Sequence, residues 1–230
     1  MKEINITDLY GQSHTIDLDN LGNQAFRMDC MELMRALPDK CFELAIVDPE
    51  YGINVANMKM GAGTSPRCSK IEHRQWKPKD WDIKPVNKSY FHELFRISIN
   101  QIVWGGNYFG LPATRCFVVW DKGAGMQDRS FSECEYAWTS FSESARVKYF
   151  NPVQTDRFHP TQKPSELYAY LLSKFAHKGD RILDTHLGSG SSRIAAWQAG
   201  YNFLGTEIDA DYFKAQEERY ASYAAQYKLF

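Results

Sequence analysis

Four consecutive residues, Asp48-Pro49-Glu50-Tyr51, combine a carboxylate, a proline and an aromatic ring directly after the apolar run 44–47. Such a run predicts a strand, and open α/β sheets bind ligands at the carboxyl ends of their strands. Because proline cannot continue a strand, the backbone should leave the sheet with the Pro49 carbonyl free. The Asp48 carboxylate and the Pro49 carbonyl could then accept both hydrogens of an exocyclic amino group while Tyr51 stacks on the base. The alternative is an ordinary strand-end turn, which Gly52 would also fit.

A second candidate site is the glycine turn around Gly188 and Gly190, within the segment 184–192 between a predicted strand and a predicted helix. Glycines allow a tight turn and close backbone approach by a ligand, and the helix amides face that ligand. Glu207 follows the next predicted strand, where a carboxylate can accept hydrogen bonds from both ribose hydroxyls. Arg193 replaces the third glycine of the dinucleotide fingerprint, which disfavours a nicotinamide cofactor. The pattern favours an adenosine-containing ligand; the alternative is turn packing without a ligand.

The segment between Gly52 and Tyr90 is basic, with eight Lys or Arg residues against three Asp or Glu residues, an excess of five positive charges. Glycines, prolines and two tryptophans are interleaved with the charges, so the segment predicts a loop that follows phosphates. The candidate nucleic-acid-binding residues are Lys59, Arg67, Lys70, Arg74 and Lys77. A solvated linker is the alternative.

Composition is that of an ordinary globular protein, with 230 residues, 43% hydrophobic and 24% charged residues. This length suits a single domain over 1–230. The net charge of −1 excludes a generally basic nucleic-acid binder, so any such binding must be local. The aromatic share of 14% is compatible with base stacking and equally with a well-filled core.

Five cysteines, an odd number without C-x-x-C spacing, indicate a reduced, cytoplasmic protein. Cys68 and His73 are the only Cys/His pair near ligand spacing, and without a second pair we predict no metal site. No apolar run reaches membrane-spanning length, and the first residues lack an apolar signal core.

The remaining pattern alternates between strands and helices, which predicts an α/β fold with a mostly parallel sheet. A peripheral hairpin is expected around 4–6 and 15–18. Strands are expected at 24–28, 43–47, 101–104, 116–120, 135–139, 146–150, 181–183 and 202–205. Helices are expected at 30–37, 89–99, after Pro164, at 191–199 and from about 210. In the helix 89–99, Ser89 is the expected cap and Phe91, Leu94, Phe95 and Ile99 share one face.

Taken in order, the segments 26–30, 48–53, 159–164 and 184–190 resemble those of the permuted, beta-type family of DNA adenine-N6/cytosine-N4 amino-methyltransferases. In that arrangement the catalytic motif precedes the cofactor motif, and the likeness covers about residues 22–220. It implies a doubly wound, mostly parallel Rossmann-like methyltransferase sheet with helices on both faces. It also implies one domain with a basic loop insertion at about 53–88 and a small inserted target-recognition region at about 121–158.

The resemblance implies S-adenosyl-L-methionine as the cofactor and Asp48, Pro49 and Tyr51 as the catalytic residues. The implied cofactor-binding residues are Asp29, Cys30, Lys163, Asp184, Gly188, Ser189, Gly190, Ser191 and Glu207. Asp29 would accept from the cofactor's adenine, Glu207 would bind the ribose, and Lys163 would meet a carboxylate at the methionine end. A rigid, proline-bounded helix entry is the alternative for the segment 159–164.

Asp at position 48 resembles the adenine-N6 members more than the cytosine-N4 members, so adenine-N6 methylation of double-stranded DNA is the expected reaction and cytosine-N4 methylation its alternative. The chain departs from the family where Glu50 replaces Pro and where Thr185-His186 replaces Pro-Phe. A nucleic-acid-binding subunit that lost catalysis through these changes is a further alternative, and a nicotinamide oxidoreductase is supported by the glycine turn alone.

Lys59 or Arg67 would be the partners that neutralise Glu50. So short a recognition region is compatible with a homodimer or a helper surface, whereas a restriction partner cannot be read from the sequence.

Overall fold

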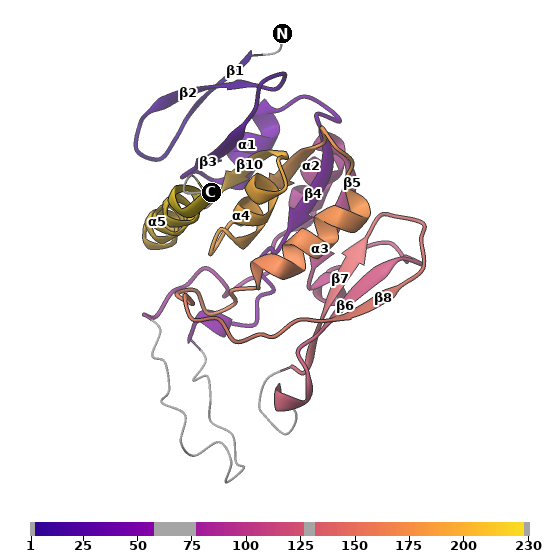
Figure 1. Cartoon of the computed structure of the whole chain (residues 1–230). Helices are drawn as coiled ribbons and strands as arrows, with labels where there is room; N and C mark the ends of the chain where they lie inside the picture. Colours follow the sequence, from indigo (N-terminus) through magenta and orange to yellow (C-terminus); the bar gives the residue numbers. More distant parts are fainter. Residues whose placement is uncertain (1–2, 58–76, 127–131, 228–230) are drawn as a thin grey trace.

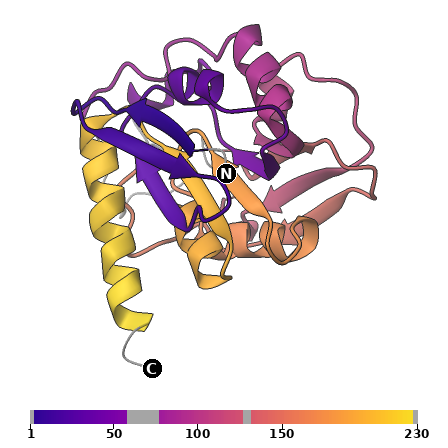
Figure 2. The same cartoon turned by 90° about the horizontal axis from the view of Figure 1, so that it is seen from above.

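The structure, a computed structural model, describes residues 3–57, 77–126 and 132–227. It begins with a two-stranded antiparallel hairpin, β1 (Glu3–Thr7) and β2 (Ser13–Asp17). The hairpin that the sequence predicts is therefore confirmed. Tyr10 in its turn contacts Phe213 of the last helix, α5 (Ala210–Tyr227), with ring centroids 6.3 Å apart. Both views place hairpin and helix side by side at one edge of the molecule (Figures 1 and 2).

One sheet of eight strands forms the centre of the molecule, in the order β3-β10-β9-β4-β5-β7-β6-β8. Their bounds are β3 (Asn23–Phe26), β4 (Phe42–Val47), β5 (Ser98–Trp104), β6 (Phe117–Asp121), β7 (Cys134–Thr139), β8 (Arg146–Tyr149), β9 (Arg181–Asp184) and β10 (Asn202–Thr206). Only β7 runs against its neighbours β5 and β6 in this sheet. The mostly parallel sheet is thus confirmed.

Helices cover both faces of the sheet (Figure 1). One face packs against α1 (Cys30–Ala36) and α2 (Lys88–Ile97), the other against α3 (Ser165–Phe175) and α4 (Ser191–Gln198). The central strand β4 is apolar and buried from Leu44 to Val47 because both of its faces are covered there. Ala45 and Val47 belong to the core beside α1 and α2, and Leu44 and Ile46 to the core beside α3 and α4.

The strands β9 and β4 lie side by side, and the chain leaves them in opposite directions across the sheet. From β9 it proceeds to β10, and from β4 to β5. Such a switch point opens a crevice outside the carboxyl ends of the two strands. Both motifs singled out in the sequence, the tetrapeptide after β4 and the glycine turn after β9, lie at this point.

Two details of the sequence prediction were wrong. Asn87, not Ser89, caps α2, its side chain accepting from the Tyr90 amide at 3.2 Å, and Ser89 donates to Asn87 instead. Ile99 belongs to β5 and is half exposed, because α2 ends at Ile97. The interval 121–158 supplies β7 and β8 to the main sheet, close to the strands expected at 135–139 and 146–150.

Among the described residues, no helix is long and apolar enough to cross a membrane.

Candidate active site

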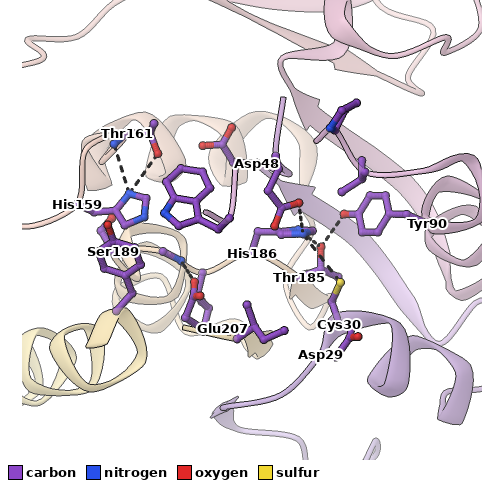
Figure 3. A pocket seen from close by; sticks show the side chains of 18 of the residues that line it. Asp29, Cys30, Asp48, Tyr90, His159, Thr161, Thr185, His186, Ser189 and Glu207 are labelled. Atoms are coloured by element: carbon purple, nitrogen blue, oxygen red, sulfur yellow. Dashed lines mark hydrogen bonds and ion pairs between the residues drawn. The ribbon is translucent and has the colours of Figure 1, made fainter. Parts of the chain in front are cut away.

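A cavity of about 430 Å³ opens at the switch point, a volume in the range of small-molecule sites. Its wall comes from the loops after β3, β4, β9 and β10, and from the segments 81–87 and 159–163. Figure 3 shows His159, Thr161 and Ser189 at one end of this cavity, and Asp29, Cys30 and Tyr90 at the other.

The glycine turn and Glu207 form one side of the cavity. Gly188 has a φ of +49°, a left-handed conformation that favours glycine. Its amide donates to Glu207 Oε2 at 2.8 Å, and the Asp209 amide donates to Oε1 at 2.8 Å. Each carboxylate oxygen can accept a second hydrogen bond, so Glu207 is held in place with capacity left for two ligand hydroxyls. Burial raises the pKa of this carboxyl to about 7.

Asp29 caps α1, its Oδ1 accepting from the Met31 amide at 2.8 Å. The second carboxylate oxygen has no hydrogen-bond partner among the described residues. Asp29 and Cys30 both line the cavity, as does Met28. The acceptors Asp29 and Glu207 therefore suit a ligand with amino and hydroxyl groups, such as an adenosine.

Three residues predicted to bind the cofactor support the turn from behind and are not among the described residues that line the cavity. Asp184 is buried, accepting from Ser192 Oγ at 2.5 Å and from the His186 amide at 3.0 Å. Gly190 faces Gln216, and Ser191 Oγ accepts from Arg219 at 2.9 Å.

Three aromatic rings from separate parts of the chain close the cavity above the glycine turn. Trp81 stacks on His159 with centroids 5.5 Å apart, and His159 meets Tyr212 edge-on at 4.2 Å. Burial and nearby cationic side chains lower the pKa of His159 to about 3, so its ring is neutral at pH 7. Lys79 fastens the segment that carries Trp81, through ion pairs of 2.7 Å to Asp209 and 2.8 Å to Asp211.

The carboxylate of Asp48 lines the cavity and is held at both oxygens. The Tyr51 hydroxyl donates to Oδ1 at 2.5 Å, and Lys163 Nζ donates to Oδ2 at 2.5 Å. Lys163 was predicted to meet a cofactor carboxylate, but the structure places its ammonium group on Asp48. No described residue donates to the Pro49 carbonyl, which agrees with the prediction that this oxygen is free.

Lys163 belongs to a row of alternating charges that continues away from the cavity. Its Nζ is 3.0 Å from Glu135 Oε2, and Glu135 Oε1 is 2.8 Å from Lys122 Nζ. Burial opposes ionisation of Glu135, but the two lysine charges outweigh it and lower its pKa to about 2. The side chain of Lys163 is only 2% exposed, so its pairs stand in a low-dielectric setting where they fix geometry.

Tyr51 is not one of the described residues that line the cavity, because its ring packs against other residues of the chain. It stacks on Tyr108 with centroids 4.8 Å apart and lies against Gly105. A Cβ at Gly105 would be 2.2 Å from Tyr51 Cε1, so only glycine fits there. Tyr108 is 46% exposed, which makes it the outward-facing ring of this stack.

Glu50 is neutralised by a residue that the sequence did not suggest. Its Oε2 is 3.3 Å from His186 Nε2, and both residues line the cavity. The partners expected from the sequence, Lys59 and Arg67, lie outside the described residues, as do Lys70 and Arg74.

Lys77 is exposed, near the point where the described part of the basic segment resumes. Cys68 and His73 are also outside the described residues. Among those that are described, no cluster of His, Cys, Asp or Glu suits a metal ion.

Several residues of the site give no usable signal in the sequence. Glu135 is an acid in a strand, Tyr90 and Tyr212 lie on helices, and nothing in their spacing relates them to Asp48 or Glu207. Trp81 is one of the two tryptophans of the basic segment, which is the only hint that the sequence offers of its place in the site.

Comparison with known proteins relates the whole arrangement to DNA methylation. A family model described as DNA methylase matches residues 64–218, about two thirds of the chain. This match includes the segment 159–164 and the glycine turn, and it begins after Tyr51. The putative methylase YubD of Escherichia coli K12 is 24% identical over 207 residues, covering 84% of this chain and 88% of YubD.

Solved structures share the fold. The M1.HpyAVI–SAM complex has a TM-score of 0.52 at 17% identity, covering 85% of this chain and 98% of that one. The PvuII DNA methyltransferase, described as cytosine-N4-specific, has a TM-score of 0.55 at 11% identity, covering 88% and 91%. The family match, with the fold and the cavity at the switch point, leads to one conclusion: the chain belongs to the N6/N4 DNA methyltransferase family.

Proposed function

We propose that this DNA methyltransferase transfers a methyl group from S-adenosyl-L-methionine to the exocyclic N6 of adenine in double-stranded DNA. The observation that carries the proposal is the position of Asp48, a carboxylate at the carboxyl end of β4 that lines the same cavity as the glycine turn and Glu207. Aspartate at this position resembles the adenine-N6 members of the family.

S-adenosyl-L-methionine is the family's methyl donor, and when bound it supplies a methyl group on a positively charged sulfonium. The cavity fits it in volume and in donor set. Glu207 would accept from the ribose hydroxyls and Asp29 from the adenine amino group, while the Gly188 turn allows close backbone approach. The neutral His159 ring, covered by Trp81, would exclude water from the methionine end without placing a positive charge beside the sulfonium.

The acceptor nitrogen needs help, because its lone pair is delocalised into the adenine ring. Asp48 and the Pro49 carbonyl would accept its two hydrogens and draw the nitrogen toward tetrahedral geometry, with the lone pair aimed at the methyl group. Lys163 and Tyr51 fix the Asp48 carboxylate for this task. Positioning and preorganised dipoles would supply most of the rate, and the nitrogen would lose its proton only after the transfer.

The target base must leave the duplex, which costs a few kcal/mol. The Tyr51–Tyr108 stack adjoins Asp48 through the Tyr51 hydroxyl, and Tyr108 is the exposed ring of the stack. Near the start of the basic insertion at 53–88, the Gly52 and Val55 amides donate to Asp82, both at 2.8 Å, and Trp81 and Lys84 on either side of Asp82 line the cavity. This placement supports a role in holding DNA there. We also assign target recognition to the interval 121–158, whose described segments 122–126 and 150–158 follow β6 and β8 at the same rim.

The direct test is transfer of labelled methyl from S-adenosyl-L-methionine to duplex DNA of mixed sequence, followed by nucleoside analysis. N6-methyladenine is the expected product. If the product were N4-methylcytosine, the proposed target base would be wrong, but the protein would still be a DNA amino-methyltransferase. Binding of DNA without binding of S-adenosyl-L-methionine by calorimetry would indicate the noncatalytic subunit instead.

A pH dependence of cofactor binding follows from Glu207. With a pKa of about 7, this carboxyl is mostly protonated at pH 6 and mostly ionised at pH 8. If the ionised form accepts the ribose hydroxyls, affinity for S-adenosyl-L-methionine should rise about tenfold between these pH values. Calorimetry at both pH values measures this, and Glu207→Gln should bind more weakly with little pH dependence.

The raised pKa of Glu207 has the opposite effect on the stability of the free protein, which should fall as the pH rises. Because the pKa of Glu207 is raised above its ordinary value, its contribution to stability is greatest below pH 4.5 and falls as the pH rises through 7.

For cofactor binding, equal affinity of the wild-type protein for S-adenosyl-L-methionine at pH 6 and pH 8 would contradict the assignment of Glu207 to the ribose.

The basic segment should control the salt dependence of DNA binding. Replacing Lys70 and Lys77 with serine should lower the slope of log K against log salt by about 0.9 for each phosphate that the variant no longer neutralises. Fluorescence anisotropy at several salt concentrations measures this slope. As a control, Lys174→Ser with Lys178→Ser changes the same charge near the end of α3 that is remote from the cavity. An equal effect of both pairs would contradict a local role.

A further inference from the structure

The contact between Glu50 and His186 joins the two halves of the site. Glu50 lies inside the catalytic tetrapeptide after β4, and His186 directly precedes the cofactor turn after β9. Their side chains are 22% and 16% exposed, and the oxygen–nitrogen distance is 3.3 Å. A side-chain contact therefore runs from the segment for the target base to the segment for the cofactor.

The two groups support each other's charge. Burial opposes ionisation of Glu50, but the His186 charge outweighs it and lowers the pKa of the carboxyl. Burial likewise opposes a charged imidazole, but the Glu50 carboxylate outweighs it and raises the pKa of His186 well above its ordinary value. At neutral pH the contact is a carboxylate–imidazolium pair, and removing one partner would leave a charge unpaired in the cavity wall.

The His186 ring is also held from its other side. Nδ1 lies 2.9 Å from Thr185 Oγ1, and this hydroxyl is 2.6 Å from the Tyr90 hydroxyl. The Tyr90 ring meets the His186 ring edge-on, with centroids 5.3 Å apart. Since Tyr90 is buried on α2 and Thr185 directly follows β9, these contacts fix the orientation of the imidazole; Figure 3 shows Tyr90, Thr185 and His186 together.

The backbone of the tetrapeptide is held on its opposite side. The Val86 amide donates to the Glu50 carbonyl at 3.3 Å, and Tyr51 forms an isolated bridge with Pro85. Glu50 is thus clamped between the segment 85–86 and His186. Any shift of Glu50 would move its neighbours Pro49 and Tyr51, and with them the oxygens meant for the amino group.

We propose that Glu50 and His186 are a positioning pair that keeps the catalytic tetrapeptide aligned with the cofactor turn. Together the two residues replace the apolar residues, Pro and Phe, that are usual at these positions in the family. The inference rests on the proposed methyl transfer. It explains why the two departures occur together: the carboxylate of Glu50 is tolerated in the cavity because the chain carries His186, and the pair takes over the alignment of the two sites.

A double-mutant cycle in steady-state methyl transfer to duplex DNA tests the pair. Glu50→Gln and His186→Gln should each lower kcat about tenfold, because small displacements of reacting groups are costly, with calorimetric affinity for S-adenosyl-L-methionine within about threefold. The double variant should be no worse than the worse single variant, and Glu50→Pro with His186→Phe should recover most of the wild-type kcat.

A merely structural ion pair gives the matched control. Glu43 and Arg181 form a 2.7 Å pair of similar exposure between β4 and β9, away from the carboxyl ends of these strands. Glu43→Gln and Arg181→Gln should lower the melting temperature and leave kcat unchanged. Melting curves of the Glu50 and His186 variants separate loss of fold from loss of alignment.

Two results would overturn the pair with the proposed function intact: unchanged kcat in the single variants, or a double variant whose loss is the product of the single losses. A wild-type protein that binds S-adenosyl-L-methionine and DNA containing the target but transfers no methyl group would overturn the proposed function, and the pair with it.

Discussion

Asp48→Ala is expected to lower kcat for methyl transfer by about 10²–10³-fold, the cost of deleting one preorganised polar group at a reacting centre. The variant removes an acceptor for the adenine amino group and leaves only the Pro49 carbonyl. Cofactor binding should persist, since Glu207 and the Gly188 turn do not depend on Asp48. Single-turnover transfer and calorimetry measure the two effects separately.

Asp48→Asn is the matched control because the amide keeps one acceptor oxygen in nearly the same place. Its kcat should fall between those of the wild type and the alanine variant. If both variants transferred methyl groups at the wild-type rate, the tetrapeptide would have no catalytic role, and the ordinary strand-end turn would be the better interpretation.

Lys163→Met should have the largest effect on stability. Lys163 is 2% exposed and lies between Asp48 and Glu135, so its loss leaves two carboxylates side by side without their shared cation. Breaking a buried charge pair from one side costs about 3–5 kcal/mol of unfolding free energy. Activity should fall as well, because Asp48 loses the donor that fixes Oδ2. Urea unfolding at pH 7 measures the first effect.

The loss of stability at acidic pH provides a second measurement of the role of Lys163. Since the pKa of Glu135 is lowered to about 2, its stabilisation is present above pH 4.5 and is lost as the pH falls toward 2. The difference in stability between pH 7 and pH 3 should therefore be smaller in Lys163→Met than in the wild type. Lys174→Met, an exposed lysine on α3, should change stability by less than about 0.5 kcal/mol. Equal stability of both variants would contradict the role of Lys163.

Local pattern was sufficient for most of the fold. The apolar run of β4 and the glycine turn after β9 mark strand ends by chemistry that acts within a few residues, and the alternation of strands and helices follows from it. Boundaries shifted where two signals competed. Asn87 and Ser89 both suit a helix cap, and Ile99 continues the apolar spacing of α2 although the chain has already entered β5.

The sequence predicted those residues of the site that are marked by the pattern of their own segment, but not the contacts between segments that are distant in the chain. Asp48 and Glu207 were singled out because each follows a strand with a recognisable pattern, and Asp29 was named through the family resemblance; all three line the cavity. The partner of Glu50 was missed because His186 is 136 positions away and meets it only after β4 and β9 have become neighbours. The contacts of Lys163 with Asp48 and Glu135 were missed for the same reason, since they join three distant parts of the chain.

The pairing of β3 with β10 has a consequence for synthesis of the protein. Ala25 lies beside Gly205, 180 positions later, and this parallel pair carries Asp29 and Glu207 at its ends. A nascent chain therefore cannot complete the end of the cavity that we propose for adenosine until β10 has been translated, although Asp48 has been synthesised long before. Cofactor binding at Glu207 therefore cannot stabilise folding intermediates that precede the synthesis of β10.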